Sequence, residues 1–253
     1  MKHNRILPLA TPFFVYVLLE LFYFKQSLIY VVLVFIFLSL LFTSRQFIQA
    51  SKIKESFWST IILPSSFTFS LIFFVIISPN NFLIQILFFF DLVFLYLYYR
   101  TLYYYLLAPE YYKDSSLQNL SAYGNFAGFY FLSSAVYGVQ VFVSASVWLL
   151  MLTMLIATLL IVYQVTWANK IDKKTGLFYI LISGLVITEI AWSVSFLSLS
   201  YFVLGLILSV SYYTIIGLLR FYLQNALNKK LVKMYLIFGL SSILLVLLTS
   251  RWV

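Results

Sequence analysis

The sequence contains no cysteine, and its only histidine is His3, close to the amino terminus. Without thiols the chain cannot form a disulfide, a thiolate metal site or a cysteine nucleophile. A single histidine outside the apolar runs also gives no support to a Ser-His protease, a His-ligated haem or a His-based zinc site. We therefore expect no catalytic residue of these kinds, no metal and no cofactor.

Charged residues are scarce as well, since only 9% of the chain is Asp, Glu, Lys or Arg, whereas 64% is hydrophobic. Soluble domains carry roughly a quarter charged residues, and a water-soluble fold cannot hide this much apolar surface. The sequence therefore predicts an integral membrane protein whose main partner is the lipid bilayer. The net charge of +9 then reflects membrane topology, so we expect no nucleic acid as a partner.

Apolar runs long enough to span a bilayer, about 20 residues each, recur along the chain between charged or turn-forming residues. They predict an all-α, polytopic transmembrane helical bundle that forms a single integral membrane domain over residues 1–253. The expected spans are 6–24, 27–43, 59–78, 82–99, 119–143, 146–167, 177–197, 200–219 and 234–250. The first run resembles a signal peptide, but no small-x-small cleavage site follows it, so we expect it to remain as a span. Because the first and fifth spans are the weakest, eight helices stay open as an alternative to nine.

The basic residues favour one orientation of these spans. If the amino terminus is cytoplasmic, 14 of the 16 Lys and Arg residues fall in cytoplasmic segments, and only Lys25 and Arg251 fall outside. Cytoplasmic loops of membrane proteins carry this excess. The outer connections, such as Lys25-Gln26, are very short, which predicts antiparallel helix hairpins. We therefore expect a multi-pass protein of the cell membrane with a cytoplasmic amino terminus.

Three carboxyl groups lie within the apolar runs, namely Glu20, Asp91 and Glu189. An ionisable group near the centre of a membrane helix costs roughly 2.5–3.5 kcal/mol on insertion scales, so each is a candidate functional residue. Asp91 has only apolar residues three and four positions away, so its partner must come from another helix. Ser193 shares a face with Glu189 and favours a hydrogen-bonded niche. Glu20 lies near the outer end of its span, where it can reach toward water or Lys25.

No Lys, Arg or His lies in the middle of an expected span, so the chain supplies no internal cation for Asp91 or Glu189. Burial without a counter-charge favours the protonated form of a carboxyl group. Three roles therefore stay open: a structural hydrogen-bond donor, a proton carrier, or a ligand for a cation or cationic substrate.

Two further patterns are interpreted as structural. Gly124 and Gly128 form a small-xxx-small motif, which predicts close packing against another helix of the same chain or of a second subunit. Tyrosines are concentrated between Arg100 and Leu117. Because tyrosine rings favour the headgroup level, we expect an interfacial segment there and not a binding loop.

The sequence favours three classes of function, in descending order. The first is a small transporter or permease for protons, cations or a cationic substrate, with Asp91, Glu189 and Glu20 as binding candidates. The second is a non-catalytic membrane subunit or scaffold, with a membrane protein partner or a homo-oligomer. The third is an enzyme acting on a lipid substrate, which would use inner-face bases such as Arg100 and Arg220. An enzyme is less favoured because no paired aspartates and no phosphate-binding glycine loop are present.

Overall fold

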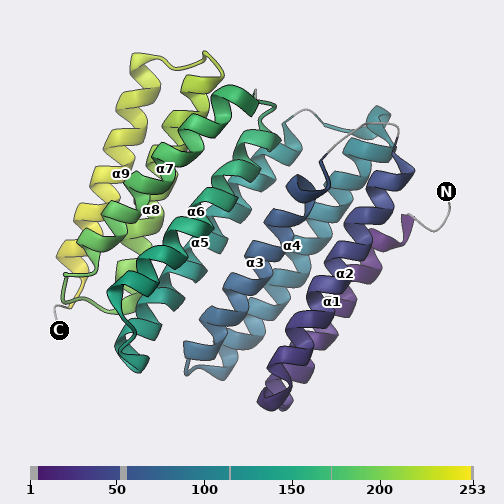
Figure 1. Ribbon diagram of the computed structural model, residues 1–253, viewed down its shortest axis with the longest axis horizontal. Coiled ribbons are helices and arrows are strands. Elements are labelled where there is room, and N and C mark those ends of the chain that lie inside the picture. Colours follow the sequence, from purple (N-terminus) through teal and green to yellow (C-terminus); the bar gives the residue numbers. More distant parts are fainter. Residues whose placement is uncertain (1–4, 52–55, 114, 172, 252–253) are drawn as a thin grey trace. The chain divides into compact units, whose positions relative to one another are not determined.

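The computed structural model of the chain describes residues 5–51, 56–113, 115–171 and 173–251 (Figure 1). Of the residues in these ranges, 87% are helical, and none lies in a strand. Nine of the described helices are long and apolar enough to span a membrane. The structure therefore confirms an all-α fold of the multi-pass membrane type, with nine such helices rather than eight.

The helices follow the expected spans closely at most ends. They are α1 Leu7–Phe24, α2 Ile29–Ala50, α3 Phe57–Ile77, α4 Asn81–Leu107, α5 Ser116–Val143, α6 Val147–Ala168, α7 Lys173–Val194, α8 Tyr201–Leu223 and α9 Lys229–Thr249, with short 3-10 turns η2 Gln26–Leu28 and η3 Pro109–Tyr111. The largest differences are at the ends of α2 and α4, which continue seven and eight residues beyond the expected 43 and 99. Polar and aromatic residues there end the apolar run without ending the backbone hydrogen bonding.

Local sequence explains where two of the long helices begin. The Asn80 side chain accepts hydrogen bonds from the backbone N–H groups of Phe82 and Leu83, at 3.0 and 3.2 Å, and so caps α4. Asn228 accepts from the Leu231 N–H at 2.8 Å and caps α9. Asparagine at this position satisfies donors that have no partner within the helix.

Some residues used in the predictions from the sequence lie outside the described residues. These are Lys2, His3, Lys52 and Lys54, together with the side chains of Lys173 and Lys174.

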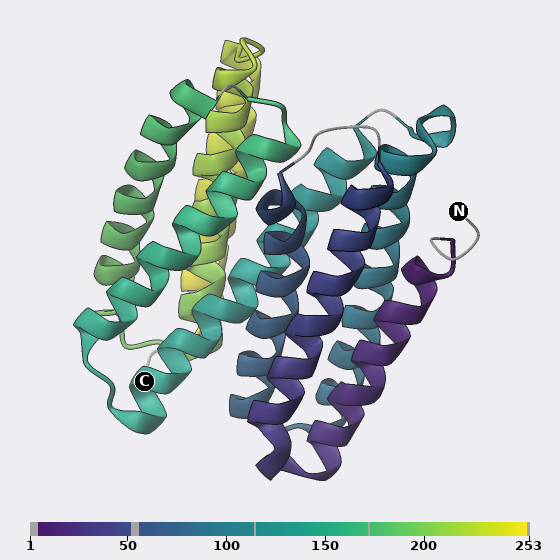
Figure 2. The ribbon, with the colours of Figure 1, turned by 45° about the vertical axis from the view of Figure 1, so that its right-hand side comes forward.

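The helices form two compact units, residues 1–124 and 125–253, which we call unit 1 and unit 2. The boundary lies inside α5. In unit 1, α1 packs against α2 and α4, and α3 packs against α2 and α4 (Figure 2). In unit 2, α7 packs against α6 and α8, and α9 packs against α8. The single domain expected over residues 1–253 stays a prediction.

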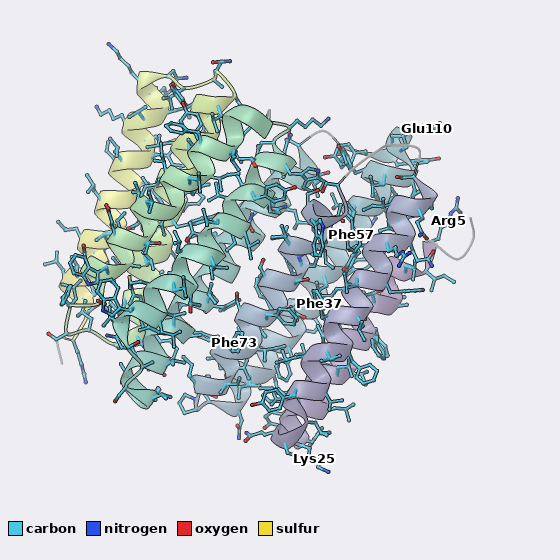
Figure 3. All side chains as sticks on the ribbon, in the orientation of Figure 1. Arg5, Lys25, Phe37, Phe57, Phe73 and Glu110 are labelled. Atoms are coloured by element: carbon cyan, nitrogen blue, oxygen red, sulfur yellow. The ribbon has the colours of Figure 1, made fainter. Side chains whose placement is uncertain are left out.

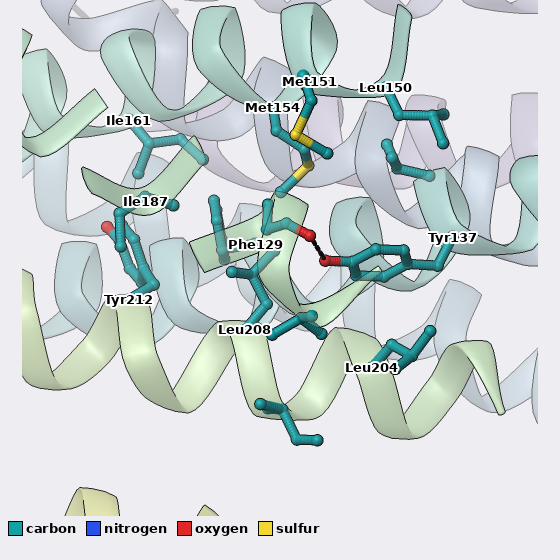
Figure 4. Packing of buried hydrophobic residues seen from close by; sticks show 14 of the residues in the cluster. Phe129, Tyr137, Leu150, Met151, Met154, Ile161, Ile187, Leu204, Leu208 and Tyr212 are labelled. Carbon is teal, nitrogen blue, oxygen red and sulfur yellow. Dashed lines mark hydrogen bonds between the residues drawn. The ribbon is translucent and has the colours of Figure 1, made fainter. Parts of the chain in front are cut away.

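Unit 2 has an apolar core built from α5 to α8 (Figure 4). The rings of Phe129 and Tyr212 stack at 4.4 Å between centroids, and Met154 and Leu208 are fully buried. The Tyr137 hydroxyl donates to the backbone carbonyl of Ala191 at 2.9 Å, so the one polar atom of this ring is satisfied.

Helices α5 and α8 meet at small residues. The Ser133 hydroxyl lies 3.2 Å from the backbone oxygen of Gly205 and 3.4 Å from the Ser209 hydroxyl. A Cβ atom added to Gly205 would lie 2.8 Å from the backbone nitrogen of Ser134. Glycine at position 205 is therefore required for the approach of the two backbones.

Candidate functional site

Asp91 lies in the interior of unit 1, on α4, with none of its surface exposed. The Thr68 hydroxyl of α3 donates to its Oδ1 atom at 2.9 Å. The partner therefore comes from another helix, as the sequence predicted. The second oxygen, Oδ2, is buried and has no hydrogen-bond partner among the described residues. One oxygen of this buried carboxyl group is therefore bonded to another helix, and the other has no hydrogen-bond partner among the described residues.

Aromatic rings surround the α4 segment that carries Asp91. Phe88 and Phe94, three residues to either side, are both buried. Phe94 stacks on Phe67 of α3 with 3.9 Å between centroids. The Phe94 ring also faces Gly124 of α5, where an added Cβ would collide with it. Gly124 therefore makes room for a ring beside Asp91, while Gly128 is buried in unit 2.

Hydroxyl groups continue the polar interior of unit 1 beyond Asp91. Two helical turns further along α4, the buried Tyr98 hydroxyl donates to the backbone oxygen of Thr60 at 2.6 Å. Thr11 of α1 and Thr43 of α2 form a buried hydroxyl pair, with 2.6 Å between their oxygens. The interior therefore contains polar groups contributed by all four helices.

Glu20 is half-buried on α1 in the same unit. Its Oε2 atom accepts a hydrogen bond of 3.3 Å from the Gln85 side chain of α4. Gln85 precedes Asp91 by six residues, a rise of about 9 Å along the helix. Glu20 therefore contacts α4 at a different level from Asp91, and each carboxyl group has its own hydrogen-bond partner.

Glu189 lies on α7 in unit 2, and its side chain is exposed within that unit. The expected niche with Ser193 is wrong, because the Ser193 hydroxyl donates to the backbone oxygen of Glu189 at 2.9 Å and not to the carboxylate. A serine four residues later in a helix commonly bonds back to this carbonyl. The neighbouring Leu185 and Trp192 are also exposed, so the carboxyl group stands on an apolar outer face.

A cavity at the end of unit 1 was not predicted from the sequence. It has a volume of about 620 Å³ and is lined mainly by two arginines and four tyrosines. These are Arg5, Tyr96, Arg100, Tyr103, Tyr104 and Tyr111. The sequence predicted only an interfacial role for the tyrosine-rich segment. It could not predict the pocket because Arg5 is distant in sequence and reaches the end of α4 only through the packing of α1 against α4.

Metal-binding groups of the usual kind are not found in the described ranges. No three His, Cys, Asp or Glu side chains lie close enough there to hold a metal ion.

Comparison with known proteins adds a family without adding a function. A family profile described as "Protein of unknown function (DUF5656)" matches residues 27–249. This match covers α2 to α9 and leaves α1 outside. No curated protein matches the chain, and no solved structure does.

Proposed function

The chain belongs to the family of proteins of unknown function DUF5656, and because this membership assigns no activity, we propose a function from the interior of unit 1. The chain is a small transporter or permease for protons, cations or a cationic substrate. Asp91 is the group that binds the transported species. The main support is the fully buried Asp91 carboxyl group. One of its oxygens accepts a hydrogen bond from Thr68, and the other has no hydrogen-bond partner among the described residues.

The cost of burying Asp91 supports this role. A carboxyl group in the hydrocarbon region is expensive, and such groups commonly mark ion or proton pathways. One hydrogen bond from Thr68 holds Oδ1 in place, which leaves Oδ2 to take up a proton or face a cation. A purely structural carboxyl group would be expected to use both oxygens.

Polar groups on either side of Asp91 along α4 could take part in proton transfer to and from its carboxyl group. Along the axis of α4, at 1.5 Å per residue, Gln85 lies about 9 Å to one side of Asp91 and Tyr98 about 10 Å to the other. Gln85 is hydrogen-bonded to Glu20 of α1. These intervals are longer than one hydrogen bond, so a proton would need an intervening hydroxyl or water. The row nonetheless places exchangeable groups on both sides of the central acid.

Replacement of Asp91 tests the transport proposal. Asp91→Asn keeps the size of the side chain and an acceptor for Thr68, so we expect the fold to persist. Flux of protons or monovalent cations into dye-loaded proteoliposomes should fall about tenfold or more, as expected when a proton-transfer group is lost. Glu110→Gln makes the matching change at an exposed position and should leave the flux unaltered. Unchanged flux in Asp91→Asn, or no flux in the natural protein, would exclude transport of protons or monovalent cations through Asp91.

We further propose that the chain lies in the cell membrane as antiparallel helix hairpins with a cytoplasmic amino terminus. The support is the excess of Lys and Arg in alternate connections. Since the chain has no cysteine, single cysteines can report the side of each loop. Lys25→Cys should react with a membrane-impermeant maleimide in intact cells, whereas Lys113→Cys should react only after lysis. The reverse pattern would invert the orientation.

A non-catalytic subunit is the second candidate, and the outer face of unit 2 favours it. Helix α9 buries only Tyr235 and Gly239, and α7 carries Glu189 on an exposed apolar face. Both helices offer surface for a membrane protein partner or a second copy. Purification in a mild detergent distinguishes the candidates, because a stoichiometric partner together with unchanged flux in Asp91→Asn supports the subunit.

A further inference from the structure

The cavity between the start of α1 and the end of α4, which we call the Arg5–Arg100 pocket, brings two positive charges together. Arg5 precedes α1, while Arg100 lies on the last two turns of α4. Among the described residues, no carboxylate forms an ion pair with either guanidinium group. Glu110 lies on the adjoining 3-10 turn but does not line the pocket. Two arginines around one cavity, with no carboxylate of the described residues paired to either, are typical of an anion site.

Tyrosines hold Arg100 in place. Its Nη1 atom donates to the Tyr96 hydroxyl at 3.4 Å. Its guanidinium carbon lies 5.9 Å from the centroid of the Tyr96 ring and 5.8 Å from that of Tyr104. Tyr96 and Tyr104, four residues before and after Arg100, therefore restrict the rotamers of its side chain. Other N–H groups of the guanidinium remain able to donate to a ligand. Such a preorganised guanidinium loses less entropy when it binds an oxyanion.

The length of α4 places this pocket at the membrane surface. Its 27 residues extend about 40 Å, whereas the hydrocarbon core is about 30 Å thick. Figure 3 shows Arg5 and Glu110 at one end of unit 1 and Lys25 at the opposite end. The pocket is therefore at the level of the lipid headgroups, where tyrosine is favoured.

We propose that the Arg5–Arg100 pocket binds a phosphate group, presented by an anionic phospholipid headgroup. Arginine pairs with phosphate through two parallel hydrogen bonds, and the tyrosine hydroxyls add further donors. Pro8, Leu9 and Ala108 give the pocket an apolar part that suits the glycerol and upper acyl region of a lipid. The volume of about 620 Å³ lies within the usual range of ligand pockets. This inference does not depend on the proposed transport.

Lipid titration of the detergent-purified protein tests the pocket. Native mass spectrometry would count bound phosphatidylglycerol for the natural chain, Arg100→Gln and Lys25→Gln. Both variants lose one positive charge in unit 1, but only the first changes the pocket. Arg100→Gln should weaken binding at least about tenfold, and Lys25→Gln should leave it within about twofold. Equal binding by the two variants would overturn the proposal.

Two additional measurements complete this test. Thermal unfolding in lipid-free detergent should be the same for the natural chain and Arg100→Gln, because Arg100 is exposed. If that variant does not fold, Arg5→Gln replaces it, since Arg5 precedes the first helix. If millimolar inorganic phosphate displaces phosphatidylglycerol, the pocket binds phosphate, and its ligand is a soluble anion and not a lipid. Retention of the lipid under the same conditions supports the lipid as the source.

Discussion

Gly205→Ala is expected to lower the unfolding free energy of unit 2 by about 1–3 kcal/mol, the usual cost of overpacking. In an ordinary helix interior the same change gains up to about 1 kcal/mol, so the sign is reversed here. The reason is the α5–α8 contact, where the added Cβ would lie 2.8 Å from the nitrogen and 2.9 Å from the Cα of Ser134. These are backbone atoms, so relief requires the two helices to move apart.

Gly176→Ala is the matched control within the same unit. A Cβ at Gly176 would lie 3.8 Å from the nearest side-chain atoms of Thr166, which is ordinary contact. The unfolding free energy of the Gly176→Ala variant should therefore equal or exceed that of the natural protein. Both variants can be compared by unfolding in mixed detergent micelles followed by far-UV circular dichroism. Equal stability of the two variants would contradict the close approach of α5 and α8.

Glu189→Leu is expected to stabilise unit 2 by about 3–4 kcal/mol. On insertion scales a charged residue near a helix centre costs roughly 2.5–3.5 kcal/mol, whereas leucine is favourable by about 0.5 kcal/mol. Glu189 is exposed in its unit, and its carboxylate receives no hydrogen bond from Ser193. The substitution would therefore replace an expensive group with one that suits the apolar surroundings of Leu185 and Trp192.

Glu189→Gln provides the intermediate case, because it removes the ionisable group but keeps a polar side chain. Its stability should lie between those of the natural chain and Glu189→Leu. Unfolding of the three proteins in the same lipid–detergent mixture gives the order. A less stable leucine variant would show that the carboxylate contacts a partner. Greater stability would mean that the chain retains Glu189 at a cost, as is common for functional residues.

The number and extent of the helices were predictable because a bilayer constrains them strongly. In lipid the backbone must satisfy its own hydrogen bonds, so an apolar run of sufficient length has to be a helix. The prediction from hydropathy did not include the last two turns of α4, because hydropathy falls at Arg100 while the helix continues to Leu107. Hydropathy reports the lipid boundary, which is not the end of the helix.

The surroundings of the candidate residues were harder to predict. That Asp91 needs a partner from another helix followed from its apolar neighbours, but Thr68 could be identified only once α3 and α4 were packed together. The small-xxx-small pattern drew attention to Gly124 and Gly128. Gly205 and Ser209, which mark the close approach of α8 to α5, have the same spacing, but the sequence prediction does not include them.

The division between the two units lies within an unbroken helix, and this determines how the chain can be taken apart. Cleavage of α5 between Gly124 and Asn125 would leave backbone donors and acceptors without partners inside the apolar phase. Two polypeptides intended to reassemble into this protein therefore have to be separated in a connection flanking α5, such as residues 144–146. Each fragment would then enter the bilayer with every one of its helices complete.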